Sequence, residues 1–133
     1  MQTVIIQHDY ALAPAVLWAA VSDRAEFALN AVSRPLRTGQ RLCADIAILG
    51  RPHPHLARIT ECDHGRMILR IALSGFLAWH HTLAVTPAAD CCRLTERFEI
   101  AQGMLNPLFA LLARNHCAMR HRRRLLLIAT GSR

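Results

Sequence analysis

One long helical segment near the end of the chain limits the fold more than any other feature. Asn106 can cap free backbone N–H groups and Pro107 suits the first helical position, so a helix is expected to begin here. No proline or glycine follows until Gly131, and a helix over 107–128 would be about 33 Å long. Apolar residues recur along it at helical spacing, at Phe109, Leu112, Met119 and Leu126. A stripe of this length needs an equally long apolar surface to cover.

The segments before this helix predict a sheet. A β-branched segment, Thr3–Tyr10, predicts a first strand. Pro14 opens a short helix over 15–22, and Asp23 can cap a second one over 24–30. Period-two patterns then predict five further strands: Arg41–Leu49, His55–Cys62, Arg66–Leu73, Phe76–Thr86 and Cys91–Ala101.

Short turns join these five strands. The segments 50–54 and 87–90 contain proline with glycine or aspartate, which are typical of turns. Short turns between successive strands favour an antiparallel meander. The sequence therefore predicts an α+β fold, in which a curved antiparallel sheet of about six strands packs on the terminal helix.

Four stretches carry a resemblance to a known superfamily. They are APAVLWAAVSD (13–23), GQRLCADIAI (39–48), CRLTERFEI (92–100) and GMLNPLFALL (103–112). In this order they resemble the START/Bet v 1-like superfamily, also called SRPBCC, which includes polyketide cyclases and small lipid-binding proteins. The resemblance covers nearly the whole chain, so residues 1–133 are expected to form one such domain. It implies a helix-grip fold with an apolar cavity between the sheet and the long helix.

Inward strand positions and the helix stripe predict where a ligand would bind. The predicted lining residues are Leu69, Ile71, Trp79, His81, Leu83, Phe98, Phe109, Leu112, His116 and Met119. Asn115 and His116, in the middle of the helix, are poor residues for a dry core, because buried polar groups need water or a ligand as partner. We expect a pocket of about 300–1,000 Å3 for a small hydrophobic or amphipathic molecule, lipid- or polyketide-like, without a cofactor.

Three polar residues on inward positions are candidates for acid–base catalysis. His81 and His116 have side chains whose pKa normally lies near neutral, and Glu96 shares a strand face with apolar residues. If they meet in the cavity, a cyclase or aromatase acting on a polyketide-like substrate is the enzymatic alternative to a binding protein. The structural alternatives are core histidines satisfied by backbone or water, and a Glu96 that is ion-paired, with Arg58 or Arg70 for example, or solvated.

The sequence gives little support for metal or nucleic acid. The pairs His80–His81 and Cys91–Cys92 point to opposite faces of their strands, and strong metal-binding spacings are missing, so no metal site is expected. The net charge is +7, but every basic residue is arginine, which indicates compositional bias, so no nucleic-acid partner is expected. The cluster 120–124 is predicted to be a solvated helix end, with an anionic partner as the alternative.

Further expectations concern location and assembly. Five cysteines without framework spacing predict reduced thiols. No apolar run approaches the ~20 residues of a membrane span, and the first ten residues lack a signal-peptide pattern, so a cytoplasmic protein that is not membrane-integral is expected. Monomer and homodimer both remain open, as does a third class of function, a protein-interaction domain.

Overall fold

The computed structural model describes residues 2–28, 31–75, 77–101, 103 and 106–131. Its elements are β1 (Gln2–Tyr10), α1 (Pro14–Val21), the 3-10 turn η1 (Arg24–Glu26), β2 (Arg41–Ile48), β3 (Arg51–Asp63), β4 (Ile68–Ser74), β5 (Trp79–Ala88), β6 (Cys91–Ile100) and α2 (Asn106–Gly131). The strands form one antiparallel sheet in the order β1-β6-β5-β4-β3-β2, so the first strand pairs with the last. The predicted α+β helix-grip fold is confirmed.

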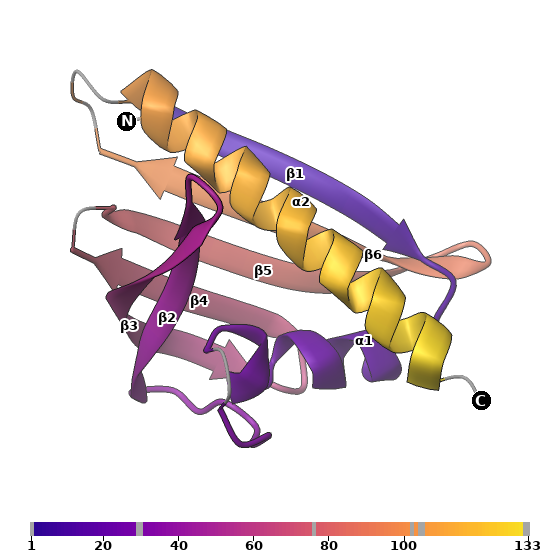
Figure 1. Ribbon diagram of the computed structural model, residues 1–133. Helices are drawn as coiled ribbons and strands as arrows, with labels where there is room; N and C mark the ends of the chain where they lie inside the picture. Colours follow the sequence, from indigo (N-terminus) through magenta and orange to yellow (C-terminus); the bar gives the residue numbers. More distant parts are fainter. Residues whose placement is uncertain (1, 29–30, 76, 102, 104–105, 132–133) are drawn as a thin grey trace.

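The long helix α2 runs diagonally across one face of the sheet, and α1 lies beneath its C-terminal end (Figure 1). The helix begins one residue before the predicted Pro107. Beside α2, the hairpin of β2 and β3 curls away from the rest of the sheet (Figure 1). Sheet, hairpin, α1 and α2 together enclose the core.

The buried face of α2 differs from the predicted stripe. Met119 and Leu126 are 42% and 69% exposed, so the prediction that they face the sheet is wrong. Among the positions of α2 whose burial the structure describes, the buried ones are Ala110, Leu112, Ala113, His116, Cys117, Arg120 and Arg124. The prediction of a solvated cluster over 120–124 is therefore also wrong for two of its arginines. Judged by hydrophobicity alone, the helix should turn Met119 toward the sheet. The structure turns the arginines inward instead, because carboxylates from other elements balance their charges.

Two predicted turns, 50–54 and 87–90, are shorter than expected, because part of each is strand. The β2–β3 turn consists of Leu49 and Gly50, whose φ angles of 52° and 77° fit the two-residue hairpin turn with two left-handed residues. Pro52 and Pro54 lie within β3, in the part that pairs with β2 but extends beyond β4, whose last residue, Ser74, pairs with Leu56. A proline is tolerated there because its missing N–H faces an unpaired edge.

Other boundaries shift by a few residues. Pro87 is a third proline within a strand and pairs with Cys92 inside the β5–β6 hairpin. Met67 has φ 57°, a left-handed turn conformation, so β4 starts after it. The predicted helix over 24–30 is only the turn η1, and its last two positions, 29 and 30, lie outside the described residues, as does Phe76 at the predicted start of the fourth strand of the meander.

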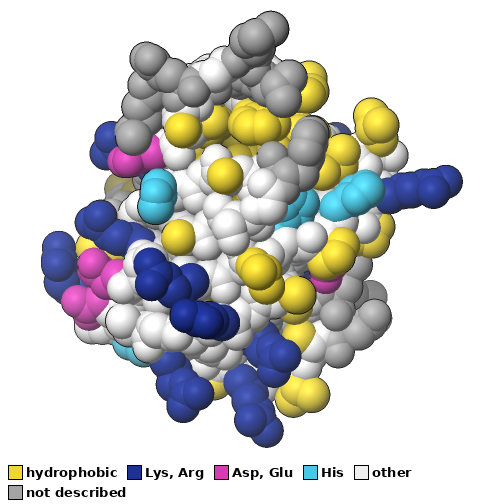
Figure 2. Space-filling view, turned by 90° about the vertical axis from the view of Figure 1, so that its left-hand side faces the viewer, with side chains coloured by type: hydrophobic (Ala, Val, Ile, Leu, Met, Phe, Trp, Pro, Cys, Tyr) yellow, Lys and Arg dark blue, Asp and Glu magenta, His cyan; other side chains and the backbone are white. Residues whose placement is uncertain are grey.

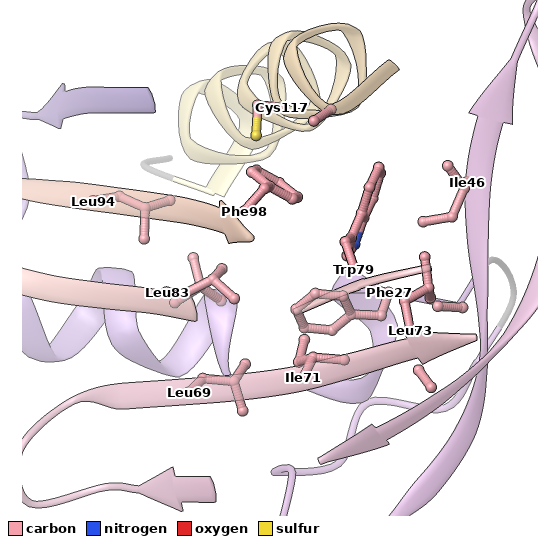
Figure 3. Close-up of a cluster of buried hydrophobic side chains, with 14 of the residues drawn as sticks. Phe27, Ile46, Leu69, Ile71, Leu73, Trp79, Leu83, Leu94, Phe98 and Cys117 are labelled. Carbon is pink, nitrogen blue, oxygen red and sulfur yellow. The ribbon is translucent and has the colours of Figure 1, made fainter. Parts of the chain in front are cut away.

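Large side chains fill the middle of the interface between sheet and helix. Phe98 and Leu83 are fully buried, and Trp79 packs edge-on against Phe98 with ring centroids 4.9 Å apart. In Figure 3 these side chains lie under α2, from which Cys117 points toward Phe98, and Phe27 joins the cluster from the side. The place where the sequence predicts a ligand is therefore occupied by the core.

Candidate functional site

Charged residues lie buried between α2, η1 and the sheet. We call this the buried ion cluster: Glu26, Glu96, Arg120 and Arg124, together with His81 and His116. Arg124 is its centre. Its Nε donates to Glu26 Oε1 at 2.7 Å, and its Nη1 lies 3.9 Å from Glu96 Oε2 and 3.3 Å from the Tyr10 hydroxyl. Three elements distant in sequence are thus joined to the helix through one guanidinium.

Glu96 and His81 form the deepest pair of the cluster. Their side chains are 0% and 3% exposed, and Nε2 of His81 lies 3.1 Å from Oε1 of Glu96. Burial alone would raise the pKa of Glu96, but the hydrogen bond to His81 and the charges around it, including Arg124, hold that pKa well below its usual value. Burial lowers the pKa of His81. Glu96 is therefore ionised, and a neutral His81 donates its Nε2 proton to it.

His116 extends the cluster along α2. Its Nε2 accepts from Nη1 of Arg120 at 3.4 Å, and its ring centroid lies 6.4 Å from that of His81. Burial, and then the positive charge of Arg120, hold the pKa of His116 well below 6.5. With both histidines neutral, two carboxylates balance two guanidiniums. This balance allows the cluster to remain buried, because an unpaired charge would be costly there.

A first cavity of about 460 Å3 lies between α1 and the C-terminal half of α2; we call it the groove. One wall is apolar and includes Leu12, Val16 and Ala20. Charged and polar groups, among them Arg124 and Glu26, meet it at the other side. Its full lining is Leu12, Val16, Leu17, Ala19, Ala20, Asp23, Ala25, Glu26, Ser33, Arg123, Arg124 and Ile128.

A second cavity of about 250 Å3 lies between α2, η1 and the β2–β3 hairpin. It is lined by Glu26, Phe27, Asp45, Ala47, Gly50, Pro52, His116, Met119, Arg120 and Arg123. Glu26 and Arg123 line both cavities, so the ion pairs of Glu26 stand between the two spaces. The buried ion cluster therefore contributes polar groups to each cavity.

The structure brings the three catalytic candidates together, since Glu96 bonds His81 and both lie near His116. Of the ten predicted lining residues, His116 and Met119 line the second cavity. The other eight line neither the groove nor the second cavity: Leu69, Ile71, Trp79, His81, Leu83, Phe98, Phe109 and Leu112. The predicted partners of Glu96 are wrong, because Arg70 pairs with Glu61 at 3.5 Å and Arg58 is exposed on the other face.

Sequence reasoning missed Glu26, Arg120 and Arg124 as parts of the site. A signal was present: His116, Arg120 and Arg124 are spaced by four residues and so lie on one face of a helix. That face follows Leu112, which was expected to point inward, so the polar row could have been recognised as a continuation of the buried stripe.

Several other groups carry no site in the described ranges. No three His, Cys, Asp or Glu side chains among the described residues are arranged to hold a metal ion. The cysteines Cys43, Cys62, Cys91, Cys92 and Cys117 are all free thiols. Within the described part of the chain, no helix combines the length and hydropathy needed to cross a bilayer.

Comparison with solved structures shows the same fold in several proteins. A START superfamily protein from Mycobacterium smegmatis is similar with a TM-score of 0.68 and 16% identity, over 95% of this chain and 98% of that one. A protein from Rhodobacter sphaeroides reaches a TM-score of 0.75 at 17% identity, over 96% and 92%. DynU16, a putative protein in the dynemicin biosynthetic locus, has a TM-score of 0.70 at 17% identity, over 97% of this chain and 48% of that one. No family model and no curated protein matches the sequence.

Proposed function

We propose that the protein binds a small amphipathic molecule in the groove between α1 and α2. The observation that carries the proposal is the division of the groove into an apolar wall and a charged end. Its volume of about 460 Å3 lies within the range of about 300–1,000 Å3 that is usual for ligand sites. The helix-grip fold commonly binds hydrophobic ligands, and this supports the same class of ligand here.

The apolar wall is suited to the body of such a ligand. Val16 is 56% exposed although it lies in the groove, so covering it with a ligand would remove apolar surface from water. Ala19 and Ala20 have small side chains, which leave room between the helices. Trp18, on the same helix, donates from Nε1 to Nδ1 of His64 at 3.0 Å, and this bond holds the wall in place against the sheet.

The charged end is suited to a polar head group. Arg124 is held rigidly by Glu26 and Tyr10, so the polar groups at this end are fixed before a ligand arrives. Arg123 adds hydrogen-bond donors from the exposed side of α2, and Ser33, whose hydroxyl donates to Asp23 Oδ2 at 2.8 Å, adds an acceptor from the loop. An amphipathic molecule would place its apolar body along α1 and its polar end against these groups.

The experiment uses the neutral dye N-phenyl-1-naphthylamine, whose fluorescence rises in apolar surroundings. Wild type should bind it, and Ala20→Trp, which fills the groove, should bind at least tenfold more weakly. Ala118→Trp is the matched control, because this exposed residue of α2 does not line the groove. Circular dichroism establishes that each variant is folded. Equal affinity of folded Ala20→Trp and wild type would reject the groove as the site.

One observation favours a cyclase-type enzyme as a second candidate function. Among the three catalytic candidates, His116 lines a cavity, and the Glu96–His81 pair lies behind it. To accept a proton from a ligand hydroxyl or enol, neutral His116 would exchange the hydrogen bond that its Nε2 accepts from Arg120 for one from the ligand. Incubation with a linear poly-β-ketone thioester should give a cyclised product that is lost with His116→Phe. The same products and rates for both proteins would reject this function.

A further inference from the structure

Arg120 is a buried cation with weak partners. Its side chain is 9% exposed, yet its recorded polar contacts are long: 3.4 Å from Nη1 to His116 and 4.0 Å from Nε to Glu26. A charge-assisted hydrogen bond normally measures about 2.7–2.9 Å. The carbon of its guanidinium lies 4.2 Å from the ring centroid of Phe27, which covers it from one side. Five N–H donors are thus directed into a region with few good acceptors.

Glu26 does not provide a close hydrogen-bond acceptor for Arg120. Its Oε1 accepts the short bond from Arg124 at 2.7 Å, and Arg120 reaches the same oxygen only at 4.0 Å. The carboxylate of Glu26 therefore faces two guanidiniums, and it lies closer to that of Arg124. Among the described residues, the ion pair of Arg120 is this long contact, so a ligand carboxylate would give Arg120 a closer partner.

The second cavity offers the space for that partner. Arg120 lines it together with apolar groups from Phe27, Ala47 and Met119. At about 250 Å3 the cavity is smaller than most ligand sites, which restricts it to a small molecule. We infer that this cavity is a binding site for a small monocarboxylate with a compact apolar body, whose carboxylate pairs with Arg120.

The charges around the cavity favour a single negative charge. Four charged residues line it: Glu26, Asp45, Arg120 and Arg123. These residues carry two negative and two positive charges, so the lining is neutral as a whole; Arg124 holds Glu26 Oε1 at 2.7 Å, and the same oxygen lies 4.0 Å from Arg120. A monoanion would add one carboxylate beside Arg120, whereas a phosphate dianion would bring a second negative charge into this neutral lining. The site does not depend on the groove, which is lined by a different set of apolar residues.

The experiment is an NMR titration with benzoate in 150 mM salt, followed at the side-chain Nε–H of Arg120 and the backbone amides of Ala47 and Met119. Benzoate should shift these signals, while the neutral analogue benzyl alcohol should bind at least tenfold more weakly. Inorganic phosphate tests whether any oxyanion is accepted, and it should also bind at least tenfold more weakly. Tenfold corresponds to about 1.4 kcal/mol.

Variants distinguish this site from general attraction to a basic surface. Figure 2 shows exposed arginine side chains gathered over the lower part of one side of the molecule, so an anion has other places to bind. Arg120→Met should weaken benzoate binding at least tenfold, and Arg122→Met, an exposed arginine of the same helix, should not. Ala47→Leu fills the cavity without changing a charge and should abolish the shifts; it decides the question if Arg120→Met does not fold.

Three results would overturn the inference: no shifts of the cavity signals in the wild type, equal binding of benzoate and benzyl alcohol, or unchanged binding by folded Ala47→Leu. Failure here leaves the groove proposal standing, because N-phenyl-1-naphthylamine carries no carboxylate and Ala47 does not line the groove. Conversely, loss of dye binding in Ala20→Trp should leave the benzoate shifts unchanged.

Discussion

The substitution Glu96→Gln tests whether the buried ion cluster holds the helix on the sheet. It keeps the size of the side chain and removes one negative charge from a position that is 0% exposed. The glutamine can still accept the proton of His81, but Arg124 loses a counter-charge 3.9 Å away. Two guanidiniums then face Glu26 alone, and the cluster carries an unbalanced positive charge.

The distance gives the magnitude. With an effective dielectric constant of about 20, two unit charges about 4 Å apart attract each other by about 4 kcal/mol. Breaking a buried pair by removing one partner typically costs about 3–5 kcal/mol, in agreement with this figure. We expect Glu96→Gln to lower the free energy of unfolding by about 3 kcal/mol or more. For a domain of this size the melting temperature should fall by roughly 10–15 °C.

Urea unfolding at pH 7, followed by circular dichroism, measures this loss. Glu99→Gln is the matched control: it lies three residues further along the same strand, and its partner Arg97, at 3.3 Å, is half exposed. The control should cost about 0–1 kcal/mol, as usual for surface pairs. A loss below 1 kcal/mol for Glu96→Gln would mean that Glu96 is not an ionised member of the cluster in the folded protein.

Three further predictions follow from local features. Burial holds the pKa of His116 below 6.5 in the folded state, so below that pH the unfolded chain binds more protons than the folded protein. The free energy of unfolding should therefore fall from pH 7 to 5, by up to about 1.4 kcal/mol per pH unit for this group. His116→Gln should make the slope in urea titrations shallower, and exposed His80→Gln should not. Leu49→Asn should raise the free energy of unfolding by about 0.5–1 kcal/mol, since Leu49 has φ 52° and is 95% exposed; a loss would contradict the turn geometry. A thiol reagent should modify exposed Cys43 rapidly and buried Cys117 only on unfolding; fast labelling of folded Cys43→Ser at Cys117 would contradict the packing of α2.

The sheet and the helix were predictable because their signals are local. Period-two alternation placed Glu96 on the inward face of β6, and the structure confirms this position. Its ion-pair partner Arg124 was not predictable in the same way, because the rotation of α2 about its axis decides which residues of the helix face the sheet. Hydrophobicity favours Met119 as the inward residue, whereas the structure buries Arg120, whose charge is compensated only by residues distant in sequence.

The errors at Pro52 and Pro54 have a similar origin. Proline is a sound turn signal wherever a strand has neighbours on both sides. At this end β3 is longer than β4, so its prolines have a neighbouring strand on one side. How far one strand extends beyond the next depends on the pairing of the whole sheet, which a local sequence pattern does not contain. The position of the cavities was equally non-local, because large side chains such as Phe98 fill the centre of the interface and the groove lies at its side.

Pairing of β1 with β6 also has a consequence for synthesis on the ribosome. Gln2 pairs with Ile100 and Tyr10 with Cys92, so the partners are separated by 98 and 82 residues. At about 5–20 residues per second, β1 waits roughly 4–20 s before its neighbour has been made. During this time Val4 and Tyr10, both 2% exposed in the finished fold, have neither β6 beside them nor α2 packed over the strand. During this interval the first strand is accessible to chaperones on the nascent chain, and slower translation of the segment between β1 and β6 lengthens it.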